Sequence, residues 1–161
     1  MDLGIYPLNA SRYLTGEEPV EFAAFTSTID KDGRFSEVDE NVAWTMKFPS
    51  GAIANCASSY GASIPAYFRV SGSKGWLEMS PAYYYDGMRL RGSYRSEAAA
   101  GHAVEIDETS PDKDPIEFTR QMDHFAECIL QNRTPKTPGE EGLRDMRYIK
   151  AIYKTAGVTV L

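Results

Sequence analysis

Few of the features that mark nucleic-acid-binding or membrane proteins occur in this chain of 161 residues. Basic residues number 17 against 23 acidic ones, so the formal net charge is −6 and no positive excess is available for a nucleic-acid backbone. The sequence has no run of about 18 apolar residues and no signal-peptide pattern, so no membrane span is predicted. We therefore expect a globular protein with neither a nucleic-acid nor a membrane partner.

Cysteine and histidine are scarce, with two of each. Cys56 and Cys128 are far apart and lack metal-ligand spacing, so we expect two small buried side chains without a disulfide. This fits a reducing compartment and a cytoplasmic protein, or a periplasmic one if a signal peptide lies upstream. Neither His102 nor His124 has further ligands grouped with it, so no metal site is predicted, and His124 is expected to be structural.

The hydrophobic pattern changes from a short helical segment, through strands, to two longer helices. The first helix is expected over about residues 3–14, with Gly16 as its stop, although Pro7 could delay its regular part. The last two are expected to begin with capping boxes at Asp114-Pro115-Ile116-Glu117 and Thr137-Pro138-Gly139-Glu140. Strands are expected over 20–29, 38–48, 52–60, 66–71, 76–79, 83–91 and 102–106, with a polar loop over 93–101.

This order predicts an α+β fold in which a mostly antiparallel, open sheet carries the helices packed on one face. Within 38–48 the side chains of Val38, Val42, Trp44 and Met46 share a parity, so they are expected to point to one side of the sheet. The other face is left for a ligand, a partner subunit or a partner domain. We expect residues 1–161 to form a single domain.

A polar stripe on the first helix is the most informative local feature. On a helical wheel, Asp2, Tyr6, Asn9 and Tyr13 fall on one side. A carboxylate and an amide can bind hydroxyl groups and a phenol can move a proton, so such a stripe would suit a sugar pocket. The same pattern is also typical of a solvated helix face, and spacing does not separate the two interpretations.

Several other polar residues have two interpretations. Tyr60 at a strand end could line the pocket or pack at an interface. Arg12, like Asn9, could bind sugar hydroxyls, but it lies off the stripe and could instead form a structural ion pair. Glu37, Asp39 and Glu40 are expected to be solvated charges at a sheet edge.

The chain resembles the C-terminal domain of the glucose–fructose oxidoreductase/inositol dehydrogenase family, often written Gfo/Idh/MocA. The family carries an Asp-x-Gly-x-His/Tyr pattern just after its Rossmann domain, and here this pattern is Asp2-Leu3-Gly4-Ile5-Tyr6. Further similarity to the glucose–fructose oxidoreductase branch lies in Arg12-Tyr13-Leu14, Gly16-Glu17-Glu18-Pro19, Phe48-Pro49-Ser50-Gly51-Ala52, Ser58-Ser59-Tyr60, Gly72-Ser73-Lys74-Gly75 and Pro138-Gly139-Glu140-Glu141-Gly142.

The resemblance implies an enzyme that passes hydride between a sugar-like CH–OH group and NAD(P). In that family the cofactor lies on the Rossmann domain, while the C-terminal domain offers an open sheet to the substrate and to a second subunit. Tyr6 matches the catalytic acid/base position and Asp2 the acidic residue that orients the substrate. A lysine from a Glu-Lys-Pro motif belongs to the Rossmann half. Ionising a free tyrosine at pH 7 costs about 4 kcal/mol, which such a lysine and an oxidised nicotinamide would reduce.

The sequence contains no Gly-x-Gly-x-x-Gly and has no room for a βαβ dinucleotide unit. We therefore expect the cofactor domain to lie outside this chain, the isolated chain to be inactive and to bind no NAD(P), and the protein to be a homo-oligomer. One alternative is a stand-alone carbohydrate-binding or oligomerisation module. Another is an unrelated α+β lyase or isomerase, for which Asp2 and Tyr6 would be the acid/base pair.

Overall fold

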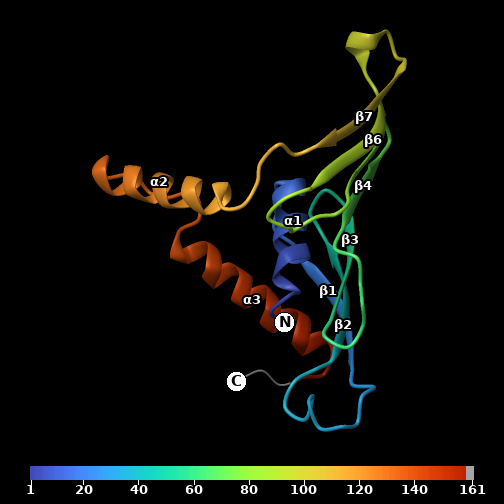
Figure 1. The fold of residues 1–161 in the computed structure, drawn as a ribbon. Coiled ribbons are helices and arrows are strands. Elements are labelled where there is room, and N and C mark those ends of the chain that lie inside the picture. Colours follow the sequence, from blue (N-terminus) through green and yellow to red (C-terminus); the bar gives the residue numbers. More distant parts are fainter. Residues whose placement is uncertain (159–161) are drawn as a thin grey trace. The chain divides into compact units, whose positions relative to one another are not determined.

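The computed structural model describes residues 1–158, which form three α-helices, one 3-10 turn and seven strands (Figure 1). In chain order these are α1 (Ile5–Thr15), β1 (Glu21–Ser27), β2 (Asn41–Lys47), β3 (Ile53–Ser59), β4 (Phe68–Gly72), β5 (Gly75–Met79), β6 (Arg89–Arg95), η1 (Glu97–Ala99), β7 (Ala103–Thr109), α2 (Ile116–Leu130) and α3 (Gly139–Thr155).

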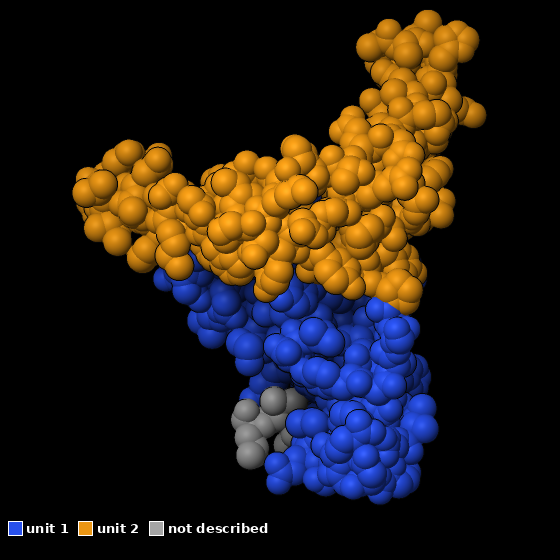
Figure 2. All heavy atoms as spheres, in the orientation of Figure 1, with its two compact units in different colours: residues 1–64, 137–161 blue, residues 65–136 orange. Residues whose placement is uncertain are grey.

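The strands form two open sheets, with the orders β1-β2-β3 and β4-β5-β6-β7. Every neighbouring pair is antiparallel, so the predicted α+β fold with antiparallel open sheets is confirmed. The chain divides into two compact units, coloured separately in Figure 2. Unit 1 contains residues 1–64 and 137–161, and unit 2 contains residues 65–136.

The core of unit 1 lies between its three-stranded sheet and two helices. Side chains alternate along β2, so Val42, Trp44 and Met46 are at most 3% exposed while their neighbours face the other way. Helix α3 packs on β1, and α1 packs on β3 and α3 (Figure 1). The core cluster consists of Leu8, Ala24, Val42, Trp44, Met46, Phe48, Ile149, Ile152 and Tyr153. Val38, predicted to share this face, precedes β2 and is 57% exposed.

The opposite face of the same sheet is exposed and almost uncharged at its centre. Phe25 stands opposite Ala43, which stands opposite Ala57, and Phe25 is 82% exposed. Small side chains line the centre of this face beside Phe25, while Ile53 lies at one end of the sheet in register with the ion pair of Lys47 and Glu21. Unit 1 thus has the predicted arrangement of one face under helices and one face left open.

The four-stranded sheet of unit 2 has one charged and one apolar face. On the charged face Arg89 bonds Asp107 and Arg91 bonds Glu78, both across neighbouring strands. Strands β5 and β6 approach closely at Gly75, whose φ is 153° and whose missing Cβ would lie 2.1 Å from a backbone oxygen of β6. The opposite face carries apolar, half-buried side chains: Phe68, Met79, Leu90, Val104 and Ile106.

Helix α2 has an amphipathic sequence, but its apolar row is exposed. Phe118 contacts the ring of Tyr85 at 5.4 Å between centroids and is still 43% exposed, while Leu130 is 85% exposed. The other exposed apolar residues of the row are Met122, Phe125 and Ile129. Both long helices were expected to cover a sheet face. Helix α3 does so in unit 1, whereas the apolar row of α2 is exposed.

Several predicted boundaries were wrong. The strand predicted over 83–91 is β6, which begins only at Arg89, because Gly87 has a φ of 68° that interrupts extended backbone. Most of the predicted loop over 93–101 is instead the end of β6 and the turn η1. Neither capping box forms: α2 and α3 have Pro115 and Pro138 as N-caps, with no side-chain cap. No helix within residues 1–158 has the length and apolarity needed to cross a membrane.

Candidate functional site

The N-terminal end of α1 carries the residues that the sequence singled out. The helix begins at Ile5, so Pro7 lies in its first turn, where a missing N–H is tolerated. Leu8 and Arg12 face inward and are buried, whereas Tyr6 is 49% exposed on the outer side. Asp2 lies in the turn before the helix and is exposed, so the predicted stripe runs from this turn onto α1.

Asp2 and Tyr60 are brought together although 58 positions separate them. Tyr60 follows the last residue of β3, and its phenol Oη donates to Asp2 Oδ2 at 3.1 Å. Burial, the hydrogen bond to Asp2 and the charges of Asp2 and Asp39 raise the pKa of Tyr60. The phenol of Tyr60 is thereby kept as a proton donor next to a carboxylate.

A second phenol–carboxylate pair lies near the first. Tyr153 on α3 is 7% exposed and donates to Asp39 Oδ1 at 2.6 Å. Burial and the hydrogen bond to Asp39 raise the pKa of Tyr153, and Tyr60 contributes through its charge. The four side chains thus form a polar network that joins the start of α1, the start of β2, the end of β3 and the last turn of α3.

The prediction that Asp39 and Glu40 are solvated charges was wrong. Asp39 is bound by Tyr153, and Glu40 is 7% exposed. The carboxylate of Glu40 accepts the backbone N–H groups of Ile29 at 2.6 Å and Asp30 at 2.9 Å. The chain between β1 and β2 folds back over Glu40, so the carboxylate of Glu40 binds backbone N–H groups and is shielded from water. Glu37 is exposed, as predicted.

Arg12 takes the ion-pair role that was the alternative to binding a ligand. It is 6% exposed, and its guanidinium contacts Glu18 at 2.7 Å, Glu141 at 2.6 Å and Asp145 at 2.6 Å. The hydrogen bond to Glu18 is the largest cause that raises the pKa of Arg12, and the same bond lowers that of Glu18. The ring of Tyr148 lies 5.4 Å from the guanidinium carbon. Arg12 therefore joins α1 to α3.

Asn9 is oriented by the same cluster. Its Nδ2 donates to Asp145 Oδ2 at 2.9 Å, on the other oxygen of the carboxylate that binds Arg12. Glu141 and Asp145 were not among the residues predicted for the site, although their i,i+4 spacing on one helix face was a usable signal. Tyr153 was not predicted for the site either.

Both cysteines are free, as predicted; Cys128 is buried and Cys56 is half-buried. Burial raises the pKa of Cys56. His124 has the predicted structural role, because its Nε2 accepts the backbone N–H of Lys136 at 3.0 Å. Among residues 1–158 no three histidine, cysteine or acidic side chains are grouped as a metal site would require.

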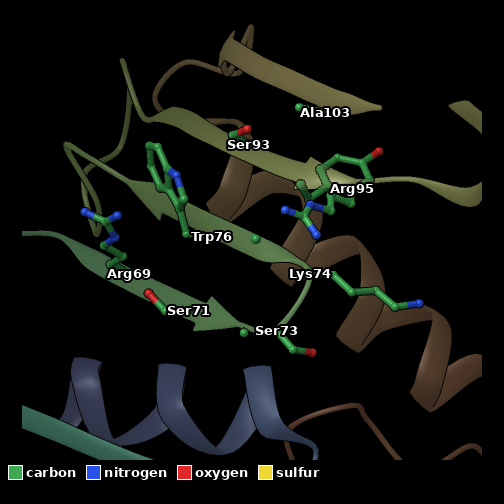
Figure 3. A pocket seen from close by; sticks show the side chains of 11 residues that line it. Arg69, Ser71, Ser73, Lys74, Trp76, Ser93, Arg95 and Ala103 are labelled. Carbon is green, nitrogen blue, oxygen red and sulfur yellow. The ribbon is translucent and has the colours of Figure 1, made fainter. Parts of the chain in front are cut away.

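Unit 2 holds an open groove of about 460 Å³ on its sheet (Figure 3). Its lining includes the cationic side chains of Arg69, Lys74 and Arg95. Arg69 stacks on Trp76 at 4.3 Å, and Lys74 forms an exposed ion pair with Glu97 at 3.3 Å. The rest of the lining is Ser71, Gly72, Ser73, Gly75, Ser93, Tyr94 and Ala103. None of the residues predicted for the site lines this groove.

The described residues do not fit a dinucleotide in the manner of a Rossmann domain. Such a site needs parallel strands and a helix that begins beside a glycine-rich turn, whereas every strand pair within residues 1–158 is antiparallel. The groups gathered near the start of α1 are a carboxylate, an exposed phenol on the first turn of α1, and a second phenol that donates to the carboxylate.

A family model, a sequence relative and a solved structure are similar to this chain. The sequence model of the GFO/IDH/MocA C-terminal domain matches residues 1–78. D-xylose 1-dehydrogenase (NADP(+)) of Haloarcula marismortui is 34% identical over 158 residues, which cover 97% of this chain and 41% of that enzyme. The crystal structure of aldose–aldose oxidoreductase from Caulobacter crescentus with glycerol is 45% identical, with a TM-score of 0.82 over 96% of this chain and 44% of that chain.

A more distant structure shares the fold alone: an oxidoreductase domain protein from Kribbella flavida is 18% identical, with a TM-score of 0.77 over 97% of this chain and 47% of that one. The chain spans less than half the length of each of these relatives. The similarity to the two sugar enzymes extends along nearly the whole chain, as the distributed motifs predicted. Residues 1–78 thus match the C-terminal domain of the GFO/IDH/MocA family, and the similarity to the two sugar enzymes continues through the rest of the chain.

Proposed function

We propose that residues 1–161 are the substrate-side domain of an NAD(P)-dependent oxidoreductase that acts on a CH–OH group of a sugar or polyol. The observation that carries this proposal is the position of Tyr6 and Asp2 on consecutive turns at the start of α1, in the family's Asp-x-Gly-x-Tyr pattern. The relatives at 34% and 45% identity are a D-xylose dehydrogenase and an aldose–aldose oxidoreductase, which supports a sugar substrate.

Oxidation of an alcohol to a carbonyl removes one proton from the hydroxyl and one hydride from the carbon. We assign the proton to Tyr6, whose exposed side chain can accept it as a phenolate during oxidation and return it as a phenol during reduction. Asp2 is acceptor-only when ionised, so it can fix a hydroxyl donor of the sugar. Asn9 and Tyr60 are the further predicted contacts, while Arg12, enclosed by carboxylates, acts by positioning α1.

The hydride acceptor belongs to a dinucleotide-binding domain outside the described residues. The name of the xylose dehydrogenase relative includes NADP(+), and we propose NAD(P) as the cofactor of the complete protein. On this proposal the chain alone binds sugar-like molecules weakly and catalyses no hydride transfer, because the residues described here form no βαβ unit.

We also propose that the chain forms a homo-oligomer through the open face of β1-β2-β3. This face is almost uncharged at its centre, and it exposes Phe25 and Ile53 at 82% and 64%. Large exposed apolar side chains on such a face favour association, and a second copy offers a surface of matching shape and charge.

A chimera tests the proposed function. The C-terminal domain of the Caulobacter crescentus enzyme, 45% identical to this chain, is replaced by residues 1–161. We expect the chimera to oxidise one aldose while it reduces another, and chromatography of the oxidised and reduced sugars follows the reaction. Tyr6→Phe should lower the rate by about 100-fold or more. Tyr67→Phe, an exposed tyrosine outside the site, should leave it unchanged.

The outcomes separate the candidate functions. A folded chimera without activity contradicts the oxidoreductase proposal. Tight sugar binding by the isolated chain, with no effect of Tyr6→Phe, would favour the stand-alone carbohydrate-binding module instead.

A further inference from the structure

We propose that Tyr60 is a positioning residue that holds the carboxylate of Asp2 in place for the substrate, and that Asp39 and Tyr153 form the support behind it. This inference rests on the proposed function, because it assigns how the substrate-orienting carboxylate is fixed. It changes the expected role of Tyr60 from a sugar contact to a residue that acts through Asp2.

Asp2 needs such a partner because of its position. It lies in the turn before α1, is exposed, and has no helical backbone to limit its rotamers. The hydrogen bond from Tyr60 Oη reaches Oδ2 of Asp2 at 3.1 Å. The other oxygen, Oδ1, is then directed as the acceptor for a sugar hydroxyl. A phenol has a single proton to donate, so Tyr60 cannot donate to Asp2 and to the sugar at once.

Tyr60 is itself fixed by the end of β3. Its backbone N–H donates to the carbonyl oxygen of Glu40 at 3.0 Å. The hydroxyl of Ser59 accepts the backbone N–H groups of Gly61 at 3.0 Å and Ala62 at 2.9 Å, which closes the turn directly after Tyr60. The phenol is therefore presented from an ordered strand end to the less constrained turn that carries Asp2.

The support behind Tyr60 comes from α3. Tyr153 is buried and holds Asp39 at 2.6 Å, so the position of this carboxylate is set by the last turn of a core helix. Asp39 directly precedes Glu40, whose carbonyl oxygen binds the backbone N–H of Tyr60, and its negative charge adds to that of Asp2 in raising the pKa of Tyr60. Two carboxylates disfavour a phenolate at Tyr60, so Tyr60 stays a donor and the acid/base role is left to Tyr6.

The first test uses the 161-residue chain with carbon-13-labelled tyrosine, and follows the ring resonances in a pH titration by NMR. The Tyr60 signal is identified by its loss in Tyr60→Phe. We expect Asp2→Asn to lower the pKa of Tyr60 by about one unit, and Asp39→Asn to lower it by less. An unchanged pKa of Tyr60 in Asp2→Asn would show that the two side chains do not interact and would overturn the inference.

The second test uses the chimera and separates KM from kcat. Tyr60→Phe removes only the hydroxyl, and we expect KM for the aldose to rise about tenfold with a smaller change in kcat, because Tyr60 orients the binding carboxylate and transfers no proton to or from the substrate. Tyr153→Phe should raise KM in the same direction but less. Tyr67→Phe is the matched control, since Tyr67 and Tyr60 are 53% and 52% exposed.

The two proposals can fail separately. If Asp2→Asn removes activity while Tyr60→Phe changes neither KM nor kcat, the positioning role is wrong and the proposed function stands. If Tyr60→Phe lowers kcat as strongly as Tyr6→Phe does, Tyr60 handles a proton itself and the inference is wrong. If neither Asp2→Asn nor Tyr6→Phe lowers activity, both proposals are wrong.

Discussion

The phenol of Tyr153 donates a hydrogen bond of 2.6 Å to Asp39 across 114 positions of the sequence. It ties the last turn of α3 to the residues just before β2, at the side of unit 1 where Asp2 and Tyr60 meet. Arg12 makes a comparable connection at the other end of α3, through Glu141 and Asp145. Polar contacts at both ends of α3 thus flank the apolar core, and those made by Arg12 hold the last turn of α1.

Replacing Tyr153 by Phe should destabilise unit 1. The change removes the donor to Asp39 while the ring still fills its place in the core, so we expect a loss of about 1 kcal/mol in the free energy of unfolding. Urea denaturation followed by circular dichroism measures it. Tyr84→Phe, at an exposed tyrosine, is the control. A Tyr153→Phe midpoint equal to that of the unaltered chain would show that the hydrogen bond contributes nothing.

Replacing Arg12 by Met should have a larger effect. The methionine keeps most of the apolar stem, but Asp145, 5% exposed, loses its buried cation. Breaking a buried pair on one side leaves an uncompensated charge, so we expect a loss of about 3 kcal/mol. Arg34→Met is the comparison, because Arg34 pairs with Asp30 and Asp32 at the surface and should cost less than about 1 kcal/mol. Equal losses for the two variants would contradict the burial argument.

Acid should weaken the same cluster. Hydrogen bonds from Arg12 and Arg144 lower the pKa values of Glu18 and Glu141 below those of the unfolded chain. Such carboxylates stabilise the fold above their unfolded pKa of about 4.3, and this contribution is lost as pH falls through the lower folded values. Urea midpoints measured from about pH 6 to pH 3 should therefore decline, and less steeply in Arg12→Met. A midpoint that rises on acidification would contradict the sign.

Placing a charge on the open sheet face should dissociate the proposed oligomer. We expect the unaltered chain to be a dimer or larger by light scattering at micromolar concentration, and Phe25→Asp to shift it toward the monomer. Tyr13→Asp changes a residue that is 87% exposed on α1 and should leave the mass unchanged. An unaltered chain that is monomeric under these conditions would refute the proposed interface.

Local sequence patterns were sufficient to predict most of the helices and strands and some of the residues near the start of α1. The alternation through Val42, Trp44 and Met46 identified β2 and its buried face, because a strand repeats every two residues. The wheel position of Arg12, off the polar stripe, left a sugar contact and an ion pair as two interpretations, and the structure shows the ion pairs. The three tyrosines 83–85 resembled a strand by composition, but the turn signal Asp86-Gly87 was overlooked, and β6 begins only after it, at Arg89.

The network around Asp2 could not be predicted in the same way. Asp2 and Tyr60 were both singled out, yet nothing in the sequence pairs residues 58 positions apart. Asp39 and Glu40 resembled edge charges because their partners, Tyr153 and the amides of Ile29 and Asp30, are defined only by the folded loop. Long-range polar contacts depend on tertiary structure, which periodicity does not encode.

The division of unit 1 into residues 1–64 and 137–161 sets the order in which the chain can fold during synthesis. A ribosome releases the N-terminal part first, so Leu8 and Phe48 leave the exit tunnel long before Ile149 and Ile152 arrive to cover them. Unit 2 is continuous, so all of its residues leave the tunnel before α3 does. A nascent chain halted before residue 137 would therefore present the inner face of β1-β2-β3 to chaperones, and only the final helix would end that exposure.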